Sequence, residues 1–244
     1  METYLINLQR CPDRLEKMKQ ALNAIGVSFE RVEAVDSKNL TNIDFMACET
    51  PNFTFPYELR KGEIACFLSH KICWQKLIDS GDQWALILED HCIVSPKAKQ
   101  YLQSTTWIPN ECHIVQFVFS EKPIFYKKEI RLADGNRLLN TIYTSPIGTS
   151  GYFISKQAAR LALKHSNKIL SPIDNYLFGQ WSEYPKLINT WRLCGAIIKR
   201  DPELETTIKN RVKKKRRIYP LRYFIKVAIN IQRIFLKKAF QYWY

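Results

Sequence analysis

The sequence predicts an α/β fold in which an open, mixed β-sheet is flanked by helices and followed by a basic, amphipathic helical tail. Three observations support this prediction: a strand–helix–strand pattern in the first 35 residues, later alternation of strand-like and helix-like segments, and a concentration of basic residues after residue 208. A chain of 244 residues, 46% of them hydrophobic, is long enough for one large domain. We expect that domain to cover residues 1–208 and the tail to cover 209–244.

The first predicted unit is a strand, a helix and a second strand. TYLINL (3–8) is an apolar run suited to a buried strand, and SFERVEAV (28–35) alternates as a second strand does. Between them, Pro12 lies near a helix start, apolar residues keep helical spacing, and Gly26 ends the helix. Such units build parallel sheets, whose ligands bind beyond the carboxyl ends of the strands.

The remaining elements follow from the same periodicities. Residues 37–61 are irregular and rich in aromatic side chains, which predicts a loop that folds over a site. The later predictions are a helix over 62–81, strands over 84–88 and 113–119, a hairpin through Asp134–Gly135, a strand over 151–155 and a helix over 156–165.

The most informative stretch is ALILEDHCIVS (85–95), where an apolar strand ends in Glu89, Asp90 and His91. Adjacent carboxylates repel, and a buried pair is costly unless a positive charge lies beside it. A divalent cation supplies that charge: oxygen ligands suit Mg²⁺ and Mn²⁺, and an imidazole favours Mn²⁺. The alternative is a strand that ends in exposed acids, with His91 held in a turn.

Two other polar groups follow predicted strands. Residues 7–10 come after the first strand, and Asp36 lies where the second one ends. Because the carboxyl ends of parallel strands meet at one edge, we expect these groups and Glu89–His91 to share one crevice.

Six motifs occur in an order that resembles glycosyltransferase family 25, the lipooligosaccharide galactosyltransferase-like enzymes. They are INLQRCPDR (6–14), FERVEAVD (29–36), GEIACFLSHKICWQKL (62–77), ALILEDH (85–91), GTSGYFIS (148–155) and PID (172–174). The resemblance covers about residues 3–200. It implies a GT-A fold with a Rossmann-like sheet, and inverting transfer of a sugar, often galactose from UDP-galactose, to a lipooligosaccharide core sugar.

The chain departs from the family pattern at the acidic motif, which is usually Glu-Asp-Asp. Here the third position is His91, which can still ligate Mn²⁺. We therefore take Asp90 and His91 as candidate metal ligands, for Mn²⁺ or Mg²⁺, and Glu89 as a group that orients them. Metal binding weakened by His91 is the other reading.

The resemblance places the nucleotide donor beside Asn7, Gln9 and Arg10. Amide groups can read a uracil edge, and the guanidinium of Arg10 or Arg14 can pair with phosphate. Asp36 can accept hydrogen bonds from ribose hydroxyls. The structural alternatives are an ordinary helix-turn charge for Arg14 and a cap of the following turn for Asp36.

The predicted base is Asp174, where the family-like pattern places a carboxylate that can take the proton of the acceptor hydroxyl. Its alternative role is to cap a helix after Pro172. His70 is a second catalytic candidate, although a lone histidine in an apolar helix is more often a satisfied core group, and Glu183 is held in reserve. Gly148 and Thr149 are candidates for contact with the donor sugar, with tight packing as the competing reason for the glycine.

The tail holds 12 Lys and Arg residues and no Asp or Glu between 209 and 244. On a helix, Arg222, Lys226, Arg233 and Lys237 form one stripe beside apolar and aromatic residues, which is typical of a helix lying on an anionic membrane. Nucleic acid is a competing partner, but the nearly neutral body has no nucleic-acid-binding motif, and we predict no nucleic-acid contact. A solvated tail without a partner is the third reading.

The sequence thus predicts a hexosyltransferase of lipooligosaccharide or lipopolysaccharide biosynthesis, peripheral on the inner membrane. The start of the chain has no signal-peptide pattern, and the seven cysteines have no C-x-x-C spacing, so we expect a cytoplasmic enzyme with reduced thiols. Two alternatives stay open: a catalytically silent, membrane-tethered scaffold that binds nucleotide sugars, and a glucosyltransferase of the same family.

Overall fold

The computed structural model describes residues 1–41, 48, 58–141, 148–179, 182, 184–204, 227, 230–231 and 234–244. The strands of its large sheet are β1 (Glu2–Asn7), β2 (Glu30–Glu33), β3 (Trp84–Glu89), β5 (Ile114–Gln116), β6 (Ile124–Arg131), β7 (Arg137–Thr141), β8 (Gly151–Ser155), β9 (Thr190–Leu193) and β12 (Lys237–Ala239). Two small pairs join β4 (Cys92–Val94) with β11 (Ile198–Arg200) and β10 (Gly195–Ala196) with β13 (Tyr242–Trp243).

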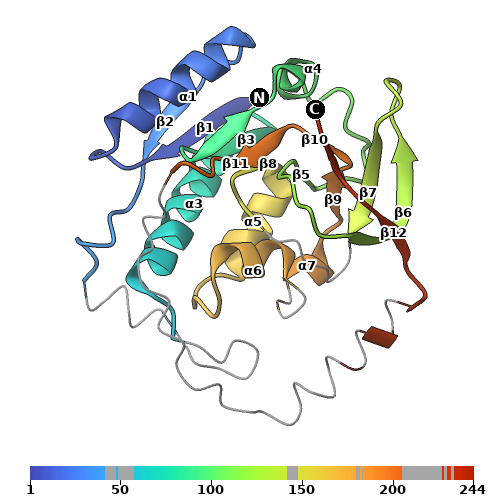
Figure 1. The fold of residues 1–244 in the computed structure, drawn as a ribbon. Coiled ribbons are helices and arrows are strands. Elements are labelled where there is room, and N and C mark those ends of the chain that lie inside the picture. The colour runs from blue at the N-terminus through green and yellow to red at the C-terminus, as the bar shows by residue number, and fades with distance from the viewer. Residues whose placement is uncertain are drawn as a thin grey trace.

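The large sheet is open and mixed, as predicted (Figure 1). Its strand order in the described chain is β12-β6-β7-β9-β5-β8-β3-β1-β2. β1 lies between β2 and β3 and is parallel to both, whereas β8 runs antiparallel to β3 and β5. The parallel trio therefore brings three carboxyl ends to one edge.

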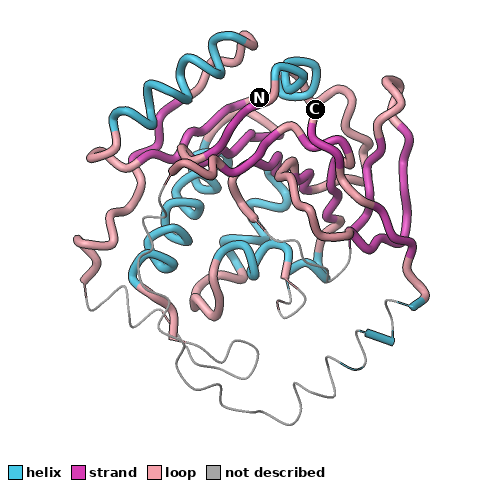
Figure 2. The backbone as a smooth tube through the Cα atoms, viewed as in Figure 1, coloured by secondary structure: helices cyan, strands magenta, loops and turns pink. Residues whose placement is uncertain are grey.

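Helices cover both faces of this sheet (Figure 1, Figure 2). One face carries α1 and α4, and the other carries α3, α5, α6 and α7. Their bounds are α1 (Pro12–Ala24), α3 (Lys61–Asp79), α4 (Lys99–Leu102), α5 (Lys156–Lys164), α6 (Ile173–Phe178) and α7 (Tyr184–Leu187), with a 3-10 turn at Pro96–Ala98.

The helix boundaries follow local chemistry. Pro12 opens α1, where its missing N–H costs nothing, and Gly26 follows α1 with a φ of 68° that favours glycine. The predicted hairpin is confirmed: Gly135, at a φ of 84°, lies in the turn between β6 and β7. The strand predicted over 113–119 is shorter, because regular pairing ends at Gln116 and Val118 makes only an isolated bridge.

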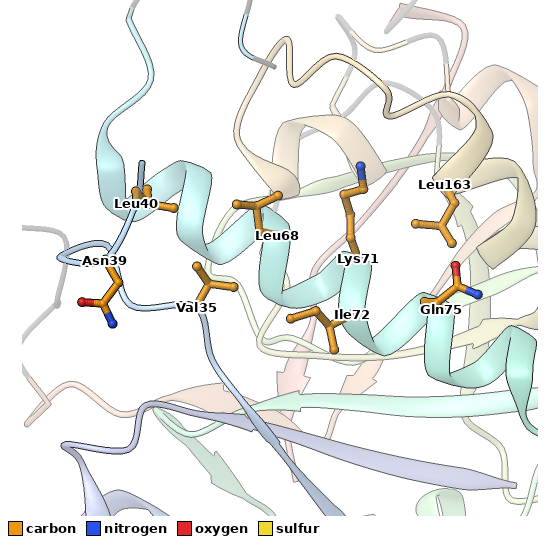
Figure 3. Close-up of a pocket in the computed structure, with 8 residues that line it drawn as sticks. All are labelled: Val35, Asn39, Leu40, Leu68, Lys71, Ile72, Gln75 and Leu163. Carbon is orange, nitrogen blue, oxygen red and sulfur yellow. The ribbon is translucent and has the colours of Figure 1, made fainter. Parts of the chain in front are cut away.

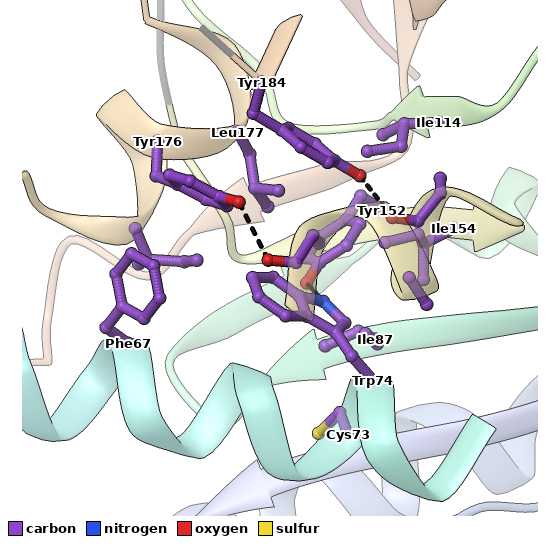
Figure 4. Close-up of a cluster of buried hydrophobic side chains, with 14 of the residues drawn as sticks. Phe67, Cys73, Trp74, Ile87, Ile114, Tyr152, Ile154, Tyr176, Leu177 and Tyr184 are labelled. Carbon is purple, nitrogen blue, oxygen red and sulfur yellow. Dashed lines mark hydrogen bonds between the residues drawn. The ribbon is translucent and has the colours of Figure 1, made fainter. Parts of the chain in front are cut away.

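The core has a layer on each face of the sheet because the central strands are buried on both sides. In β1, Leu5 packs with Met18 and Leu22 of α1, while Tyr4 and Ile6 pack toward α3. Figure 4 shows the second layer, where aromatic rings from α3, β8, α6 and α7 meet. This layer places an apolar floor beneath the edge where β3 ends.

The prediction of a helix to the end of the chain is wrong for residues 237–244. β12 pairs with β6 at the sheet edge, and β13 pairs with β10, so these residues pack on the body. The cause is long-range pairing, which the local basic stripe did not reveal. Arg222, Lys226 and Arg233 lie outside the described residues, and the boundary at residue 208 stays a prediction.

In the part of the chain that the structure describes, no helix combines the length and apolarity needed to cross a bilayer. Most of the predicted loop over 37–61 lies outside the described residues, as does Glu183.

Candidate active site

The carboxyl ends of β1 and β3 meet, as the sequence predicts. Ile6 is in register with Glu89, and the N–H of Asp90 donates to the carbonyl of Ile6 over 3.1 Å. Asn7, the last residue of β1, is in register with Glu33 of β2. Residues that follow three different strands are thereby gathered at one edge.

Asp90 is held by side chains from the first β-α-β unit. Asn7 Nδ2 donates to Asp90 Oδ2 at 2.7 Å, and Arg14 Nη1 lies 3.7 Å from Oδ1. Burial raises the pKa of Asp90, whereas the hydrogen bond from Asn7 and the charge of Arg14 oppose that rise. The carboxylate is therefore oriented and partly compensated before any ligand arrives.

Both polar atoms of the Asn7 side chain are hydrogen-bonded within the protein. Its side chain also donates to the carbonyl of Cys11 at 3.0 Å, and its Oδ1 accepts from Arg31 Nε at 3.0 Å. Because Asn7 is buried and its amide is occupied, it acts on the site through Asp90. Arg31 was not among the predicted residues, since its position in an alternating strand looks like that of any surface charge.

Glu89 is tied into the protein by three partners. Thr149 Oγ1 donates to Glu89 Oε1 at 2.5 Å, His70 Nε2 lies 3.3 Å from the same oxygen, and His91 Nδ1 lies 3.3 Å from Oε2. Burial alone raises the pKa of Glu89, but His91, His70 and Thr149 outweigh it and hold the value at about 2. Glu89 is thus an ionised anchor for its neighbours.

A hydrogen-bonded chain leads from Glu89 into the core. Trp74 Nε1 donates to the Tyr152 hydroxyl at 3.1 Å, as Figure 4 shows, and His70 Nδ1 lies 2.8 Å from that hydroxyl. Because the ionised carboxylate of Glu89 can only accept, His70 Nε2 is the donor of their contact. The Tyr152 hydroxyl accepts from the indole and can donate its own hydrogen to Nδ1. His70 is fully buried, so its place is that of a positioning group beneath Glu89.

His91 contacts different partners from Asp90. Its Nε2 lies 3.1 Å from Ser150 Oγ, and its side chain is 27% exposed. The two predicted metal ligands are thus adjacent in sequence, with Asp90 facing Asn7 and His91 facing Glu89 and Ser150. A cation bound by both would draw His91 away from one of its partners.

The donor chemistry of Asp90 and His91 nevertheless fits a divalent cation. Asp90 offers a carboxylate whose pKa is raised by burial, which marks a site short of positive charge. Arg14, at 3.7 Å, compensates only part of that charge. One oxygen and one nitrogen donor favour Mn²⁺ over Mg²⁺.

Besides Asp90 and His91, the described residues include a group of three possible ligands. They are Cys66, His70 and Glu89, whose ligand atoms lie within 4.8 Å of one another. Burial raises the pKa of the Cys66 thiol well above its usual range, with Glu89 and Asp174 adding to the rise. A protonated thiol is a poor ligand. Since His70 and Glu89 already bond to each other, hydrogen bonds account for this group without a metal.

The residues predicted to meet the donor lie around the same edge. Arg10 Nη1 pairs with Asp36 Oδ2 at 2.8 Å, and Gln9 beside it is exposed. Asp36 Oδ1 also accepts from the N–H of Lys38 at 3.0 Å, so the turn-capping role is present. The Arg10 side chain is 38% exposed and remains available to an anion.

Gly148 and Thr149 lie on the β8 side of Glu89. Gln116 Nε2 donates to the Gly148 carbonyl at 2.5 Å, and a Cβ on this glycine would lie 3.4 Å from Val118. Nearby Gly151 leaves less room, because its Cβ would lie 2.8 Å from Ile198. Packing therefore explains Gly151, whereas Thr149 contributes the bond to Glu89.

Asp174 lies in the first turn of α6. Its Oδ1 accepts from the N–H of the adjacent Asn175 at 2.7 Å, but Pro172 occupies the N-cap position and makes no side-chain cap bond, so the alternative reading of Asp174 as the helix cap is wrong. Burial raises its pKa, and the charges of Glu89 and Glu63 raise it further. Asp174 is thus within electrostatic reach of Glu89, which links the two carboxylates across 85 positions of sequence.

A shallow hollow of about 440 Å³ lies on the outer side of α3 (Figure 3). It is lined by Val35, Asn39, Leu40, Leu68, Lys71, Ile72, Gln75 and Leu163. None of the predicted site residues is in this set, and the lining holds no carboxylate. Lys71 donates to the carbonyl of Ser166 at 3.0 Å. The hollow adjoins Asp36 through Val35 and Asn39, whose N–H donates to the Asp36 carbonyl at 2.9 Å, but it contains none of the residues around Asp90 and Glu89.

Sequence reasoning missed Tyr152 and Ser150 as well as Arg31. Both lie in GTSGYFIS, where Tyr152 occupies a strand position that faces α3. Its role depends on His70, 82 residues away. The signal was a buried histidine in a helix, which needs partners for both ring nitrogens.

Comparison with known proteins agrees with the resemblance. The family described as "Glycosyltransferase family 25 (LPS biosynthesis protein)" matches residues 1–177. A "Glycosyltransferase 25 family member" of Drosophila melanogaster is 30% identical over 197 residues, covering 77% of this chain and 31% of that protein. The chain spans about a third of the length of this relative and of the other insect relatives it matches.

Shorter relatives come from bacteria. The "Lacto-N-neotetraose biosynthesis glycosyltransferase LgtB" of Neisseria gonorrhoeae is 25% identical over 189 residues, covering 73% of this chain and 67% of that protein. Among solved structures, a glycosyltransferase involved in glycosylation of the major capsid of PBCV-1 aligns with 84% of this chain and 93% of its own, with 12% identity and a TM-score of 0.46.

Proposed function

Because the chain belongs to glycosyltransferase family 25, we propose that it is an inverting glycosyltransferase that moves a hexose from a UDP-sugar to a lipooligosaccharide or lipopolysaccharide core. Galactose is the first expectation. The main structural support for the proposal is the position of Asp90, whose carboxylate is contacted by Asn7 and Arg14 where β1 and β3 end. Relatives from Neisseria that are glycosyltransferases of lacto-N-neotetraose biosynthesis support a glycan acceptor of this class.

The donor would lie across the ends of β1, β2 and β3. Arg10 and Arg14 would pair with the diphosphate, and Gln9 would read the uracil edge. Asp36 would accept from the ribose hydroxyls after its contact with Arg10 opens. On the other side, Gly148 and Thr149 would approach the donor sugar, with Thr149 kept in place by Glu89.

A divalent cation, Mn²⁺ before Mg²⁺, would be held by Asp90 and His91. When bound, it would neutralise charge on the departing diphosphate. Glu89 would hold His91 in place through the 3.3 Å contact to Nδ1, and the buried chain through His70 would keep Glu89 itself fixed.

Asp174 would be the base. The acceptor oxygen forms a bond to the anomeric carbon while the bond from that carbon to the diphosphate breaks, and the hydroxyl proton passes to Asp174. Inversion follows because attack and departure occur on opposite faces. The raised pKa of Asp174 makes its ionised form a better proton acceptor than an ordinary aspartate.

We propose attachment to the cytoplasmic side of the inner membrane through residues 209–244. The 12 basic residues and absence of acids in this range would attract anionic lipid, near a lipid-linked acceptor. A silent scaffold that binds nucleotide sugars is the competing function, favoured by His91 in place of the usual acid. A glucosyltransferase is the competing donor class.

The test is a donor screen by mass spectrometry with a truncated lipooligosaccharide acceptor and Mn²⁺. UDP-sugars are offered one at a time, because galactose and glucose add the same mass. We expect product from UDP-galactose, loss of product in Asp90→Asn and Asp174→Asn, and full product in Glu111→Gln. Glu111 is an exposed carboxylate before the amino end of β5, at the edge of the sheet opposite the carboxyl end of β3. Thermal stabilisation by UDP without turnover of any donor would establish the scaffold instead.

A further inference from the structure

The end of the chain forms a surface that the proposed chemistry does not use. Six of the ten large hydrophobic side chains exposed in the described chain lie after residue 226. Phe235, Ile234 and Phe240 are the most exposed of all, at 84%, 77% and 60%. Three large apolar side chains exposed within seven residues of sequence indicate a contact surface.

This surface is fixed to the sheet edge. β12 pairs with β6 in the register Lys238 to Phe125 and Ala239 to Ile124. Ala239 and Ile124 are buried together, so alternation along the strands turns Lys238 and Phe125 to the opposite face. Phe240 lies on that face too, with Lys238 Nζ 4.9 Å from its ring centroid.

Basic side chains border the apolar ones. Lys237 and Lys238 in β12 and Lys127 and Lys128 in β6 are exposed. The acid in β6, Glu129, is engaged by Tyr126 at 2.9 Å and by Arg137 at 3.3 Å. The edge therefore has a positive charge next to a large aromatic area.

Protection of the sheet edge against pairing with other molecules explains the lysines but not the exposed aromatic side chains. Lysines on an edge strand prevent pairing with other chains. Exposed Phe235 and Phe240 would promote association, so protection does not explain them. Aromatic rings beside lysines suit the boundary between lipid headgroups and acyl chains, where rings enter and ammonium groups stay at the phosphates.

We propose that the β12 edge, comprising Ile234, Phe235, Lys238, Phe240 and Lys127, is a docking surface for anionic lipid bilayers. The inference deepens the membrane attachment proposed above by placing the contact on the rigid body of the protein. It requires no particular donor or acceptor. Six strand spacings separate β12 from β3, so the candidate active site is held roughly 30 Å along the sheet from the contact.

Vesicle sedimentation with the full chain tests the proposal. The probes are vesicles of phosphatidylcholine alone and of phosphatidylcholine mixed with phosphatidylglycerol. We expect binding to the mixed vesicles, weakened about tenfold or more in Phe235→Ser/Phe240→Ser and in Lys127→Gln/Lys238→Gln. Each lysine contributes about fivefold, and the rings lose their burial among the lipids. The matched controls, Leu187→Ser and Lys19→Gln/Lys99→Gln, change exposed residues on other elements and should bind normally.

A third variant separates this surface from the rest of the basic tail. Replacing residues 213–217 with glutamine leaves the β12 edge intact, so substantial binding should remain. Loss of binding in this variant, together with full binding by the phenylalanine and lysine variants of the β12 edge, would overturn the proposal. Failure of the wild-type protein to bind anionic vesicles would also overturn it. Unchanged melting temperatures show that the variants fold. Binding is read without turnover, so failure of the enzymatic proposal would be seen separately in the donor screen.

Discussion

Asn7 and Asp90, 83 residues apart in sequence, share a buried hydrogen bond of 2.7 Å that joins the ends of two parallel strands. The same amide accepts from Arg31 in the third strand of the trio. One side chain thus connects β1, β2 and the acidic segment after β3. Its removal should disturb the site more than the loss of one contact implies.

We predict that Asn7→Ala lowers kcat/KM for the sugar donor by about 10- to 100-fold, because a group that orients a metal ligand has an effect of this size. It should also lower the free energy of unfolding by about 1–3 kcal/mol, since Asp90 and Arg31 lose a buried partner. Steady-state kinetics and urea denaturation measure the two effects. Asn23→Ala, on the exposed side of α1, should change neither. Normal kinetics in Asn7→Ala would show that the hydrogen bond from Asn7 is not needed to orient Asp90.

Tyr152→Phe should destabilise the protein more than Tyr176→Phe does. Both hydroxyls are buried, but Tyr152 serves Trp74 Nε1 and His70 Nδ1, whereas Tyr176 donates to the single carbonyl of Ala162. We expect a loss of about 1–3 kcal/mol for Tyr152→Phe and less for Tyr176→Phe. Urea denaturation of the three proteins gives the comparison. Equal losses would show that the hydrogen bonds linking Trp74, Tyr152, His70 and Glu89 do not stabilise the protein as one network.

Glu89 should make the protein sensitive to acid. Its pKa falls from the ordinary 4.5 to about 2 on folding, so its stabilising effect is present above pH 4.5 and is lost as the pH falls toward 2. Glu89→Gln should remove this part of the slope of unfolding free energy against pH. Denaturation at a series of pH values measures the slope, with Glu111→Gln as the control. An unchanged slope in Glu89→Gln would show that Glu89 is not held as an ionised group.

His91→Asp should shift metal preference toward Mg²⁺. A carboxylate in place of the imidazole restores an all-oxygen pair with Asp90, which suits the harder ion. The measurement is the ratio of transfer rates with Mg²⁺ and Mn²⁺ after EDTA treatment. Ser150→Ala removes only the partner of His91 Nε2, so it should leave the ratio close to that of wild type. The same ratio in His91→Asp and wild type would exclude His91 as a ligand.

The sequence was a good guide wherever one segment determined its own structure. The apolar run ending at Glu89, the α1 helix between Pro12 and Gly26 and the Asp134–Gly135 turn all depend on nearby residues. The meeting of Asn7 with Asp90 was also predictable, because parallel strands bring their carboxyl ends together.

What the sequence did not reveal depends on partners far along the chain. The contact between His70 and Tyr152 exists because α3 packs on β8, and neither residue is unusual within its own segment. The basic stripe that suggested a helix over the last residues says nothing about an open edge at β6. Pairing with that edge gave Lys237–Ala239 a strand conformation.

The joining of β12 to β6 has a kinetic consequence. Ser120 and Gln241, hydrogen-bonded beside this pair, are 121 residues apart, and contacts between such distant segments slow folding. During refolding, β6 should therefore remain for some time a bare strand that can recruit another molecule. Refolding should therefore give a better yield of native protein in dilute than in concentrated solution. The reason is that pairing of β6 with another molecule competes with its pairing with β12 of the same molecule.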